Sequence, residues 1–220
     1  MLELLKDRIA KLEPFYERNA IKGIFSWKDL ENSFNFRPSN TQSRFKVFFE
    51  EGDGYEWPSQ AWISDINAFP PSIIQRITKK YLCHIMDSSR VNETINTICG
   101  ELESITNLPT DAHIYFDLTD QQNVGFGIHF DLAHNLIVQV EGKSNVRMWD
   151  VKCYDDEKKN VKDLEEEPLF EIVMKPGDIC YAPAHYYHEV KSLTKRLSVS
   201  FPSHTLMTEP FQEREWIKIT

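Results

Sequence analysis

The sequence predicts a mainly β fold with flanking α-helices, in which an antiparallel barrel or sandwich carries helices packed outside it. Two observations support this prediction. Apolar residues recur at helical spacing between residues 70 and 105, and from residue 111 the chain changes to short strands separated by turn residues. With 220 residues, 41% of them hydrophobic, the chain is long enough for one domain with a full core. We therefore expect a single domain over 1–220.

Residues 1–110 are expected to be mainly helical, with at least one strand. The segment "RFKVFFEEGDGYEW" (44–57) is typical of a strand that leads into a glycine-containing turn. In "PPSIIQRITKKYLCHIM" (70–86), apolar residues recur near every 3.6 positions, and Pro71 suits the first turn of a helix. A second helix is predicted in "SSRVNETINTICGELESI" (88–105), after the capping-type residues Asp87, Ser88 and Ser89.

Residues 111–202 are expected to form the β core, and 203–220 a C-terminal tail. Eight segments of strand length follow one another here: "AHIYFDL", "VGFGIHFDL", "NLIVQVEG", "NVRMWDV", "LFEIVMKPGD", "ICYAP", "HEVKS" and "RLSVSF". Such a series is typical of an antiparallel barrel or sandwich. The charged stretch "YDDEKKNVKDLEEEP" (154–168) is expected to be a solvated connection, and a lid over a site is the weaker alternative.

Charge and cysteine usage restrict the partners and the compartment. The formal net charge of -9 argues against nucleic acid and anionic membranes as partners. No apolar run reaches 18 residues, and the start "MLELLKDRIAKLEPF" is charged and amphipathic, so we expect a cytoplasmic protein. The four cysteines form no CxxC pair and are expected to be reduced and structural, with Cys83 and Cys99 in helices and Cys180 in a strand.

The stretch "GIHFDLAHN" (127–135) contains the first candidate site residues. His129 and Asp131 are two positions apart, and residues at this spacing in a strand point to the same side. An unpaired carboxylate inside a barrel would be costly, and a bound metal ion would offset that cost. By itself this pair is weak evidence for a metal site, because such a pair occurs by chance.

A second pattern lies about fifty residues further on, in "MKPGDICYAPAHYYHEV". Gly177, Pro183 and His188 here mark a turn, a strand, a bend and a histidine at the start of the next strand. This spacing resembles the second motif of the cupin superfamily, from which the chain departs with His185 for a glycine and Ser192 for an asparagine. The first cupin motif is recognisable as well, in His129, Asp131, Asn135 and Gly142.

Within this superfamily, residues 110 to 202 resemble the JmjC-type and cupin-like oxygenases that depend on Fe(II) and 2-oxoglutarate. That group includes the asparaginyl hydroxylase factor inhibiting HIF and the ribosomal oxygenases. The resemblance implies a double-stranded β-helix with the N-terminal helices packed outside. It also implies that His129, Asp131 and His188 bind Fe(II) as catalytic ligands, since two histidines and one carboxylate form the facial triad of such enzymes.

The resemblance requires a cation for the far carboxylate of 2-oxoglutarate, and many relatives have a lysine fifteen residues after the first ligand. This chain has Ser144 there. Lys143 and Arg196 are the two alternatives, and we favour Arg196 because it forms an Arg-x-Ser pair with Ser198 on one strand face. A surface arginine at a strand end remains the non-functional alternative for Arg196.

Asn135 and Tyr115 are further candidate contacts of the co-substrate. Asn135 shares the inward face with His129 and Asp131, while Tyr115 could equally be a core aromatic residue. His134 has the opposite parity and is expected to face outward or lie in a turn, and His185 is expected at the rim of the site or in solvent.

The function implied by the resemblance is hydroxylation of a C–H bond by an Fe(II)- and 2-oxoglutarate-dependent dioxygenase, which converts 2-oxoglutarate and O2 to succinate and CO2. The expected substrate is an amino-acid residue in a protein or peptide, or a small amino-acid-like metabolite. Phe126, Tyr186 and Tyr187 are aromatic candidates for the mouth of the site. The 17 or so residues after the last strand are too few for the additional dimerisation domains of the ribosomal relatives.

Two other classes of protein remain open. A cupin metal enzyme that does not use 2-oxoglutarate is favoured by the missing lysine. A non-catalytic binding barrel is the other alternative, and it explains poorly why three residues are present at ligand spacing.

Overall fold

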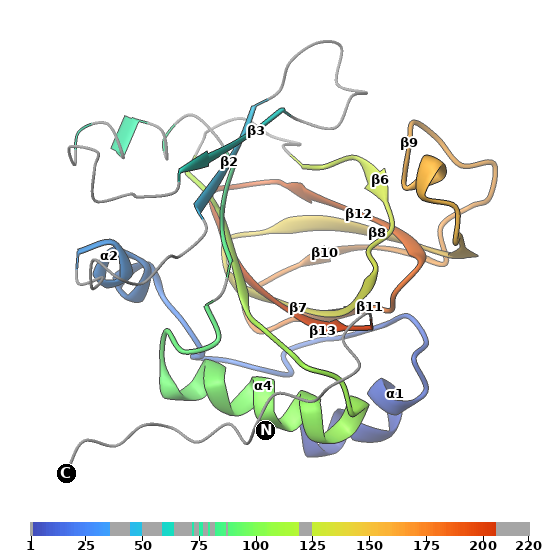
Figure 1. Cartoon of the computed structure of the whole chain (residues 1–220), viewed down its shortest axis with the longest axis horizontal. Coiled ribbons are helices and arrows are strands. Elements are labelled where there is room, and N and C mark those ends of the chain that lie inside the picture. The colour runs from blue at the N-terminus through green and yellow to red at the C-terminus, as the bar shows by residue number, and fades with distance from the viewer. Residues whose placement is uncertain are drawn as a thin grey trace.

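The structure is a computed structural model, and it describes residues 2–35, 45–49, 59–63, 72, 75–76, 79, 82–86, 88–118 and 125–205. In these residues two antiparallel sheets face each other (Figure 1). The larger sheet has the order β1 (Phe15–Glu17), β11 (Ile179–Ala182), β7 (Ala133–Glu141), β13 (Arg196–His204), β5 (His113–Asp117), β4 (Leu82–Ile85), β2 (Phe45–Phe49), β3 (Ser59–Ile63). The smaller sheet has the order β10 (Phe170–Met174), β8 (Ser144–Lys152), β12 (Tyr186–Ser192), β6 (Ile128–His129), β9 (Asn160–Val161). This architecture confirms the predicted double-stranded β-helix.

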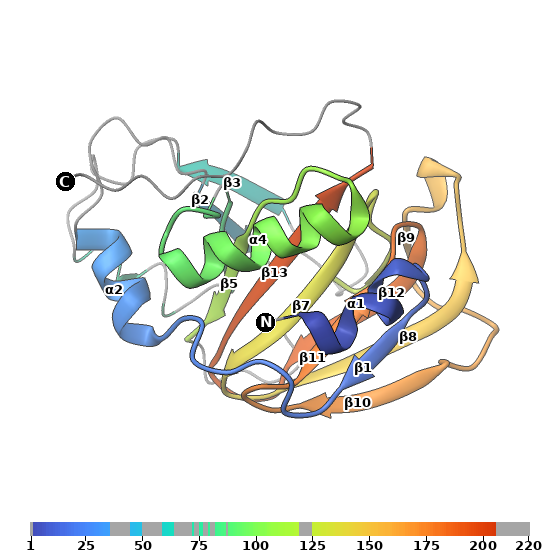
Figure 2. The ribbon, with the colours of Figure 1, turned by 90° about the horizontal axis from the view of Figure 1, so that it is seen from below.

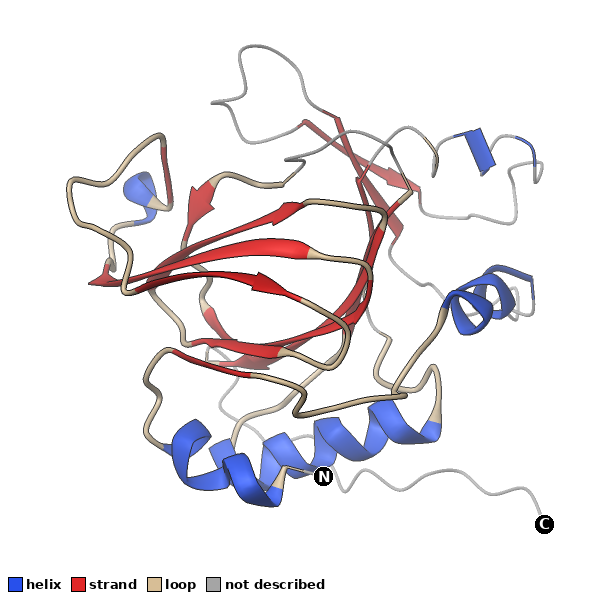
Figure 3. Ribbon diagram, turned by 180° about the vertical axis from the view of Figure 1, so that it is seen from behind, coloured by secondary structure: helices blue, strands red, loops and turns tan. Residues whose placement is uncertain are grey.

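The helices cover the outer face of the larger sheet. These helices are η1 (Glu3–Leu5), α1 (Lys6–Ala10), α2 (Trp27–Asn35) and α4 (Glu93–Thr106). A further short helix, η3 (Asp156–Lys158), lies elsewhere, on the loop between β8 and β10. Figure 2 shows α4 and α1 crossing the strands of the larger sheet, and Figure 3 shows the same arrangement from behind. In the described part of the chain, no helix is long and apolar enough to span a membrane.

Alternation along the strands separates an apolar outer face from a polar inner face. In β13, Leu197, Val199 and Phe201 belong to the core cluster that contains the buried side chains of α1 and α4. The residues that alternate with them, Arg196, Ser198 and Ser200, line a pocket on the other side. Because side chains in a strand alternate between faces, the pattern of "RLSVSF" places the polar residues between the two sheets.

The N-terminal part contains more strand than the sequence predicts. The segment predicted as a helix over 70–86 ends in strand β4, which pairs with β2 and β5. The helical prediction is therefore wrong for Leu82–Ile85, which includes Cys83. The short run "LCHI" has all four residues buried, and a buried strand and a short apolar helical turn have similar patterns. Of the preceding residues the structure describes Ser72, Gln75 and Arg76 as helical; Pro71 lies outside the described residues.

The second predicted helix is confirmed as α4, but its cap differs from the prediction. Asn92 is the N-cap and accepts a hydrogen bond from the N–H of Ile95 at 2.8 Å. Ser88 and Ser89 precede the helix, and Asp87 lies outside the described residues. Cys99 lies in α4 and Cys180 in β11 as predicted, and all four cysteines are free thiols.

The charged stretch between β8 and β10 is attached to the outer face of the smaller sheet. Trp149 donates to the carbonyl of Glu166 at 2.9 Å, and the Tyr187 hydroxyl donates to the carbonyl of Lys158 at 2.6 Å. Strand β9 pairs with β6, so this stretch is more ordered than a plain solvated connection. None of its described residues lines the pocket between the sheets, which gives no support to a lid.

Candidate metal centre and anion pocket

Two histidines from neighbouring strands of the smaller sheet face each other between the sheets. His129 in β6 and His188 in β12 are directly opposite each other in the antiparallel register, and their ring centroids are 4.4 Å apart. Asp131 follows two residues after His129, in the turn that leads into β7. One ligand atom from each of the three residues can be chosen so that all lie within 4.8 Å of one another.

Hydrogen bonds to the backbone orient both imidazoles. Nδ1 of His129 lies 3.0 Å from the carbonyl oxygen of Gly127, and Nδ1 of His188 lies 3.1 Å from that of Tyr186. Since a carbonyl oxygen can only accept, each Nδ1 carries a proton, and Nε2 is the ring nitrogen that each histidine directs towards Asp131 and would offer to a metal ion. Nε2 of His129 lies 4.0 Å from Asp131 Oδ1, and Nε2 of His188 lies 3.5 Å from Asp131 Oδ2.

The three groups shift one another's pKa values. Burial, with the His188 charge as the second cause, lowers the pKa of His129 to about 4. Burial alone would raise the pKa of Asp131, but hydrogen bonding to His188 and the two histidine charges outweigh it and lower that pKa. The pKa of His188 is raised because its hydrogen bond and attraction to Asp131 outweigh its own burial. At neutral pH the cluster therefore offers a carboxylate and a neutral imidazole from His129.

Asn135 holds the carboxylate of Asp131. Its Nδ2 donates to Asp131 Oδ2 at 2.7 Å, and its Oδ1 accepts from the Ser200 hydroxyl at 2.9 Å. Asn135 is thus placed on the inward face, as the strand parity predicts, but its amide contacts a candidate ligand in addition to lining the pocket.

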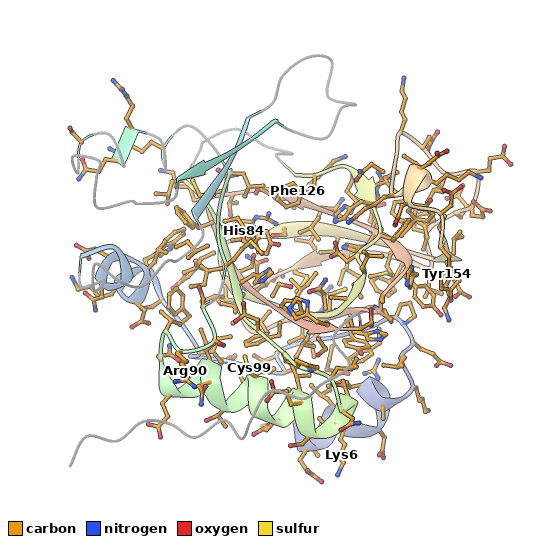
Figure 4. The ribbon with its side chains drawn as sticks, viewed as in Figure 1. Lys6, His84, Arg90, Cys99, Phe126 and Tyr154 are labelled. Carbon is orange, nitrogen blue, oxygen red and sulfur yellow. The ribbon has the colours of Figure 1, made fainter. Side chains whose placement is uncertain are left out.

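The pocket between the sheets brings together all seven predicted site residues, and four further residues complete its lining. Its described lining consists of Tyr115, Phe126, His129, Asp131, Asn135, Ile137, His188, Val190, Arg196, Ser198 and Ser200. Ile137, Val190 and Ser200 were not predicted, although each lies two positions after a predicted residue and therefore shares its strand face. Figure 4 shows Phe126 beside the strands that enclose this pocket.

Arg196 is a buried cation in the lining of this pocket. Its side chain is 2% exposed, Nη1 donates to the Ser144 hydroxyl at 3.3 Å, and the buried Nε has no hydrogen-bond partner among the described residues. Burial lowers the pKa of Arg196 to about 10, which leaves the guanidinium charged at neutral pH. Lys143, the alternative cation, is exposed. Ser144, which stands at the lysine position of many relatives, is instead a partner of Arg196.

Tyr115 lies on the same inner face. Burial raises the pKa of its hydroxyl, and the nearby Asp131 charge acts in the same direction. Its ring stacks on that of His84 at a centroid distance of 4.1 Å and contacts Phe126 edge-on at 5.9 Å. The ring is thus part of an aromatic wall of the pocket, and the neutral hydroxyl remains a potential donor.

The two histidines predicted to be non-ligands lie outside the described pocket lining. His134 accepts a hydrogen bond from the N–H of Ala184 through Nδ1 at 3.0 Å. His185 has a positive φ of 70°, at the motif position that usually holds glycine. Its ring packs on Tyr154, which Figure 4 places on the β9 side of the molecule.

Two of the three aromatic residues predicted near the mouth lie elsewhere. Tyr186 and Tyr187 belong to buried apolar clusters, and neither lines the pocket. They follow directly on the bend at His185, and a bend makes strand parity unreliable there. Phe126 alone of the three lines the pocket.

Fold and site together define a double-stranded β-helix protein with a candidate metal centre of two histidines and one aspartate. A family model described as the JmjC domain matches residues 84–209, which is more than half of the chain. The chain therefore belongs to the JmjC domain family.

Curated relatives are similar over the same part of the chain. A protein named bifunctional lysine-specific demethylase and histidyl-hydroxylase NO66, from Drosophila persimilis, is 27% identical over 128 residues, which are 57% of this chain and 18% of that protein. Ribosomal oxygenase 1 from Danio rerio is 25% identical over 111 residues, 48% of this chain and 20% of that protein. The chain thus matches a fifth or less of the length of these relatives.

Among solved structures, the ribosomal oxygenase YcfD from Escherichia coli, in complex with cobalt and 2-oxoglutarate, has a similar fold. The TM-score is 0.62 at 14% identity, and the match covers 89% of this chain and 49% of YcfD. At this identity the likeness supports the fold, and the fold alone.

Proposed function

We propose that the protein is an Fe(II)- and 2-oxoglutarate-dependent oxygenase that hydroxylates a C–H bond of an amino-acid residue. One observation carries the proposal: His129, Asp131 and His188 converge at one end of a pocket that has the buried Arg196 among its lining residues. Bound Fe(II) would supply the oxidising chemistry, in which R–H, 2-oxoglutarate and O2 become R–OH, succinate and CO2.

The donor set fits this metal. Two neutral imidazole nitrogens and one carboxylate are the ligands of non-haem Fe(II) oxygenases, and they leave coordination positions open. The backbone carbonyls of Gly127 and Tyr186 fix both rings through Nδ1, and Asn135 fixes the carboxylate, as is common around metal ligands. In this proposal the three side chains hold the metal and the polypeptide sets their orientation before it binds.

The pocket also fits a dicarboxylate. The guanidinium of Arg196 is the cation for the far carboxylate, and Ser198 lies two residues on, along the same inward face. Tyr115 and Asn135 are proposed as further hydrogen-bond donors to the co-substrate. The apolar residues Ile137, Val190 and Phe126 surround the remaining space and limit access of water.

We further propose that the substrate residue belongs to a protein or peptide. The names of the relatives support this, because they specify a histidyl-hydroxylase, a lysine-specific demethylase and ribosomal oxygenases. A free amino-acid-like metabolite is the alternative substrate. Cytoplasmic location and the absence of nucleic-acid and membrane partners remain predictions from the sequence.

The test is iron-dependent formation of succinate from 2-oxoglutarate, followed by NMR, in the wild type and in His129→Ala and His188→Ala variants. We expect turnover in the wild type and none in either variant, with His134→Ala as an active control. Bound iron without any turnover, across a range of candidate peptides, would favour a metal-dependent cupin enzyme that does not use 2-oxoglutarate. A wild type that binds no metal would contradict both enzyme functions and leave a non-catalytic barrel.

A further inference from the structure

We propose that Gln139 and Ser144 are positioning residues that aim the guanidinium of Arg196 into the pocket. This inference rests on the proposed function and extends it to two residues that do not line the pocket. Gln139 lies in β7 and is 1% exposed, and Ser144 begins β8 and is fully buried. Both are therefore buried, and a ligand in the pocket would meet Arg196 rather than these two side chains.

Three hydrogen bonds link Glu141, Gln139, Ser144 and Arg196 in a chain, and the donor and acceptor of each bond can be assigned. Nε2 of Gln139 donates to the carbonyl oxygen of Glu141 at 2.6 Å, and this bond fixes which side of the amide is oxygen. The Ser144 hydroxyl donates to Oε1 of Gln139 at 2.8 Å. Having donated its only proton, the hydroxyl can only accept, and it accepts from Arg196 Nη1 at 3.3 Å. The orientation of the amide is thus passed on to the guanidinium.

An irregularity of the larger sheet places Gln139 for this role. The register between β13 and β7 shifts after Leu197, so that Leu197 is opposite Glu141 and Ser198 is opposite Gln139, and Val140 is the extra residue. Such bulges bend a strand and redirect a side chain. The Gln139 side chain spans the bulge through its bond to Glu141, so local backbone geometry and amide orientation are fixed together.

Arg196 needs this support because an acid competes for it. Asp117 is directly opposite Arg196 in the register of β5 and β13 and is fully buried, and its charge offsets part of the lowering of the Arg196 pKa by burial. A guanidinium released by Ser144 would move towards Asp117, since opposite charges attract strongly in a buried site. The Nε of Arg196 is buried and has no hydrogen-bond partner among the described residues. We expect an anion in the pocket to accept a hydrogen bond from this side of the guanidinium.

The test separates the far carboxylate from the metal-binding end of the co-substrate. Calorimetric titrations of Mn(II)-loaded protein use 2-oxoglutarate and, as a matched ligand without the far carboxylate, 2-oxobutyrate. The wild type should bind 2-oxoglutarate more tightly. Ser144→Ala and Gln139→Leu should each weaken 2-oxoglutarate about tenfold, because a hydrogen bond to a charged group is lost, and leave 2-oxobutyrate within twofold. Ser144→Thr, which keeps the hydroxyl, should restore part of the loss.

Ser203→Ala is the control for loss of a buried serine hydroxyl, because Ser203 lies at the other end of β13 and bonds to Thr110 at 2.8 Å. It should change neither affinity. Equal loss of affinity for both acids in Ser144→Ala would show a merely structural role and contradict the inference. An unchanged preference for 2-oxoglutarate in both Ser144→Ala and Gln139→Leu would overturn the positioning role but not the proposed function. A wild type that binds the two acids equally, or neither, would overturn the proposed function.

A second readout does not depend on the metal. The Nε–H signal of Arg196 in a 15N-labelled, metal-free sample should be sharp in the wild type and in Ser203→Ala. In Ser144→Ala and Gln139→Leu it should shift or broaden as the guanidinium moves. An unmoved signal in both variants would contradict the positioning role.

Discussion

Asn135 connects the carboxylate of Asp131, a predicted metal ligand, to the hydroxyl of Ser200. Its amide donates to Asp131 and accepts from Ser200, so the carboxylate is oriented before any metal binds. Partners of this kind typically contribute 10-fold to 100-fold to metal affinity. We therefore propose a second role, at the candidate metal centre, for the side chain that the sequence suggests as a co-substrate contact.

We expect Asn135→Ala to lower the affinity for Fe(II) or Mn(II) by about 10-fold to 100-fold, because the Asp131 carboxylate loses its donor. Metal titration under anaerobic conditions measures this. His134→Ala is the matched control, since His134 lies next to Asn135 in β7 and bonds to the backbone of Ala184 instead. Equal affinities of Asn135→Ala and the wild type would refute the role.

The sequence pointed to the three candidate ligands because they lie in two recognisable short motifs, but it could not predict the hydrogen bonds from Gln139 and Ser144 to Arg196. His129 and Asp131 are two positions apart, and His188 lies in a recognisable turn and strand. The contacts of Ser144 with Gln139 and Arg196 depend on how β8 faces β13 across the barrel and on the bulge at Val140. Neither feature leaves a periodic pattern in the chain.

The turn between β7 and β8 depends on Gly142. Its φ is +71°, and a Cβ atom there would clash with the carbonyl oxygen of Lys195. Gly142→Ala should lower the free energy of unfolding by about 3 kcal/mol or more, through backbone strain and a clash with backbone.

Gly100→Ala is the opposite case: its Cβ meets nothing within 4 Å inside α4, so it should stabilise the protein by about 0.5–1 kcal/mol. Urea denaturation measures both, and equal effects would contradict this explanation.

Asp178 joins the N-terminal segment to the turn between β10 and β11. Its carboxylate accepts from the N–H of Asn19 and of Lys175, both at 2.9 Å, and from Arg18 Nη1 at 2.7 Å. Burial raises the pKa of Asp178, but these hydrogen bonds and the Arg18 charge outweigh it and lower the pKa below 3.8.

Because the folded state has the lower pKa, Asp178 stabilises the protein fully above the unfolded pKa of 3.8, and this contribution is lost as the pH falls through the folded value. Asp178→Asn should therefore be less stable than the wild type by about 2 kcal/mol at pH 7. The difference should shrink below about pH 4. Denaturation curves from pH 3 to 7 measure it, and a difference that does not change with pH would count against the ion pair.

The prediction of the elements succeeded where each has a clear period and failed where it is short. Helix α4 has an apolar stripe over four turns, and the strands from β5 to β13 other than β9 alternate or form apolar runs between turn residues. Strand β4 is four residues long and buried on both faces, so its apolar residues continued the helical pattern of the preceding segment and were predicted as part of that helix. Strands β1 and β9 have three and two residues and exist only through pairing with β11 and β6.

The pocket lies between the two sheets, so a ligand in it contacts both. His129 and His188 belong to the smaller sheet, and Arg196 and Ser198 belong to the larger one. Binding of metal and co-substrate should therefore stabilise the whole fold, by about 2.7 kcal/mol for a ligand at 100 times its Kd.

Thermal unfolding should show two increments in Tm, one on adding Mn(II) and a further one on adding 2-oxoglutarate. In Arg196→Met the first increment should persist and the second should shrink, because only the far carboxylate loses its partner. Persistence of the full second increment in this variant would exclude Arg196 as the anchor.

A crystal structure with Mn(II) and 2-oxoglutarate tests the central claim most directly. We expect one anomalous peak bonded to Nε2 of His129, Nε2 of His188 and a carboxylate oxygen of Asp131. The 2-oxo acid should contact this metal, with its far carboxylate within hydrogen-bond distance of Arg196. A metal bound elsewhere, or a far carboxylate directed away from Arg196, would contradict the proposed function of this pocket.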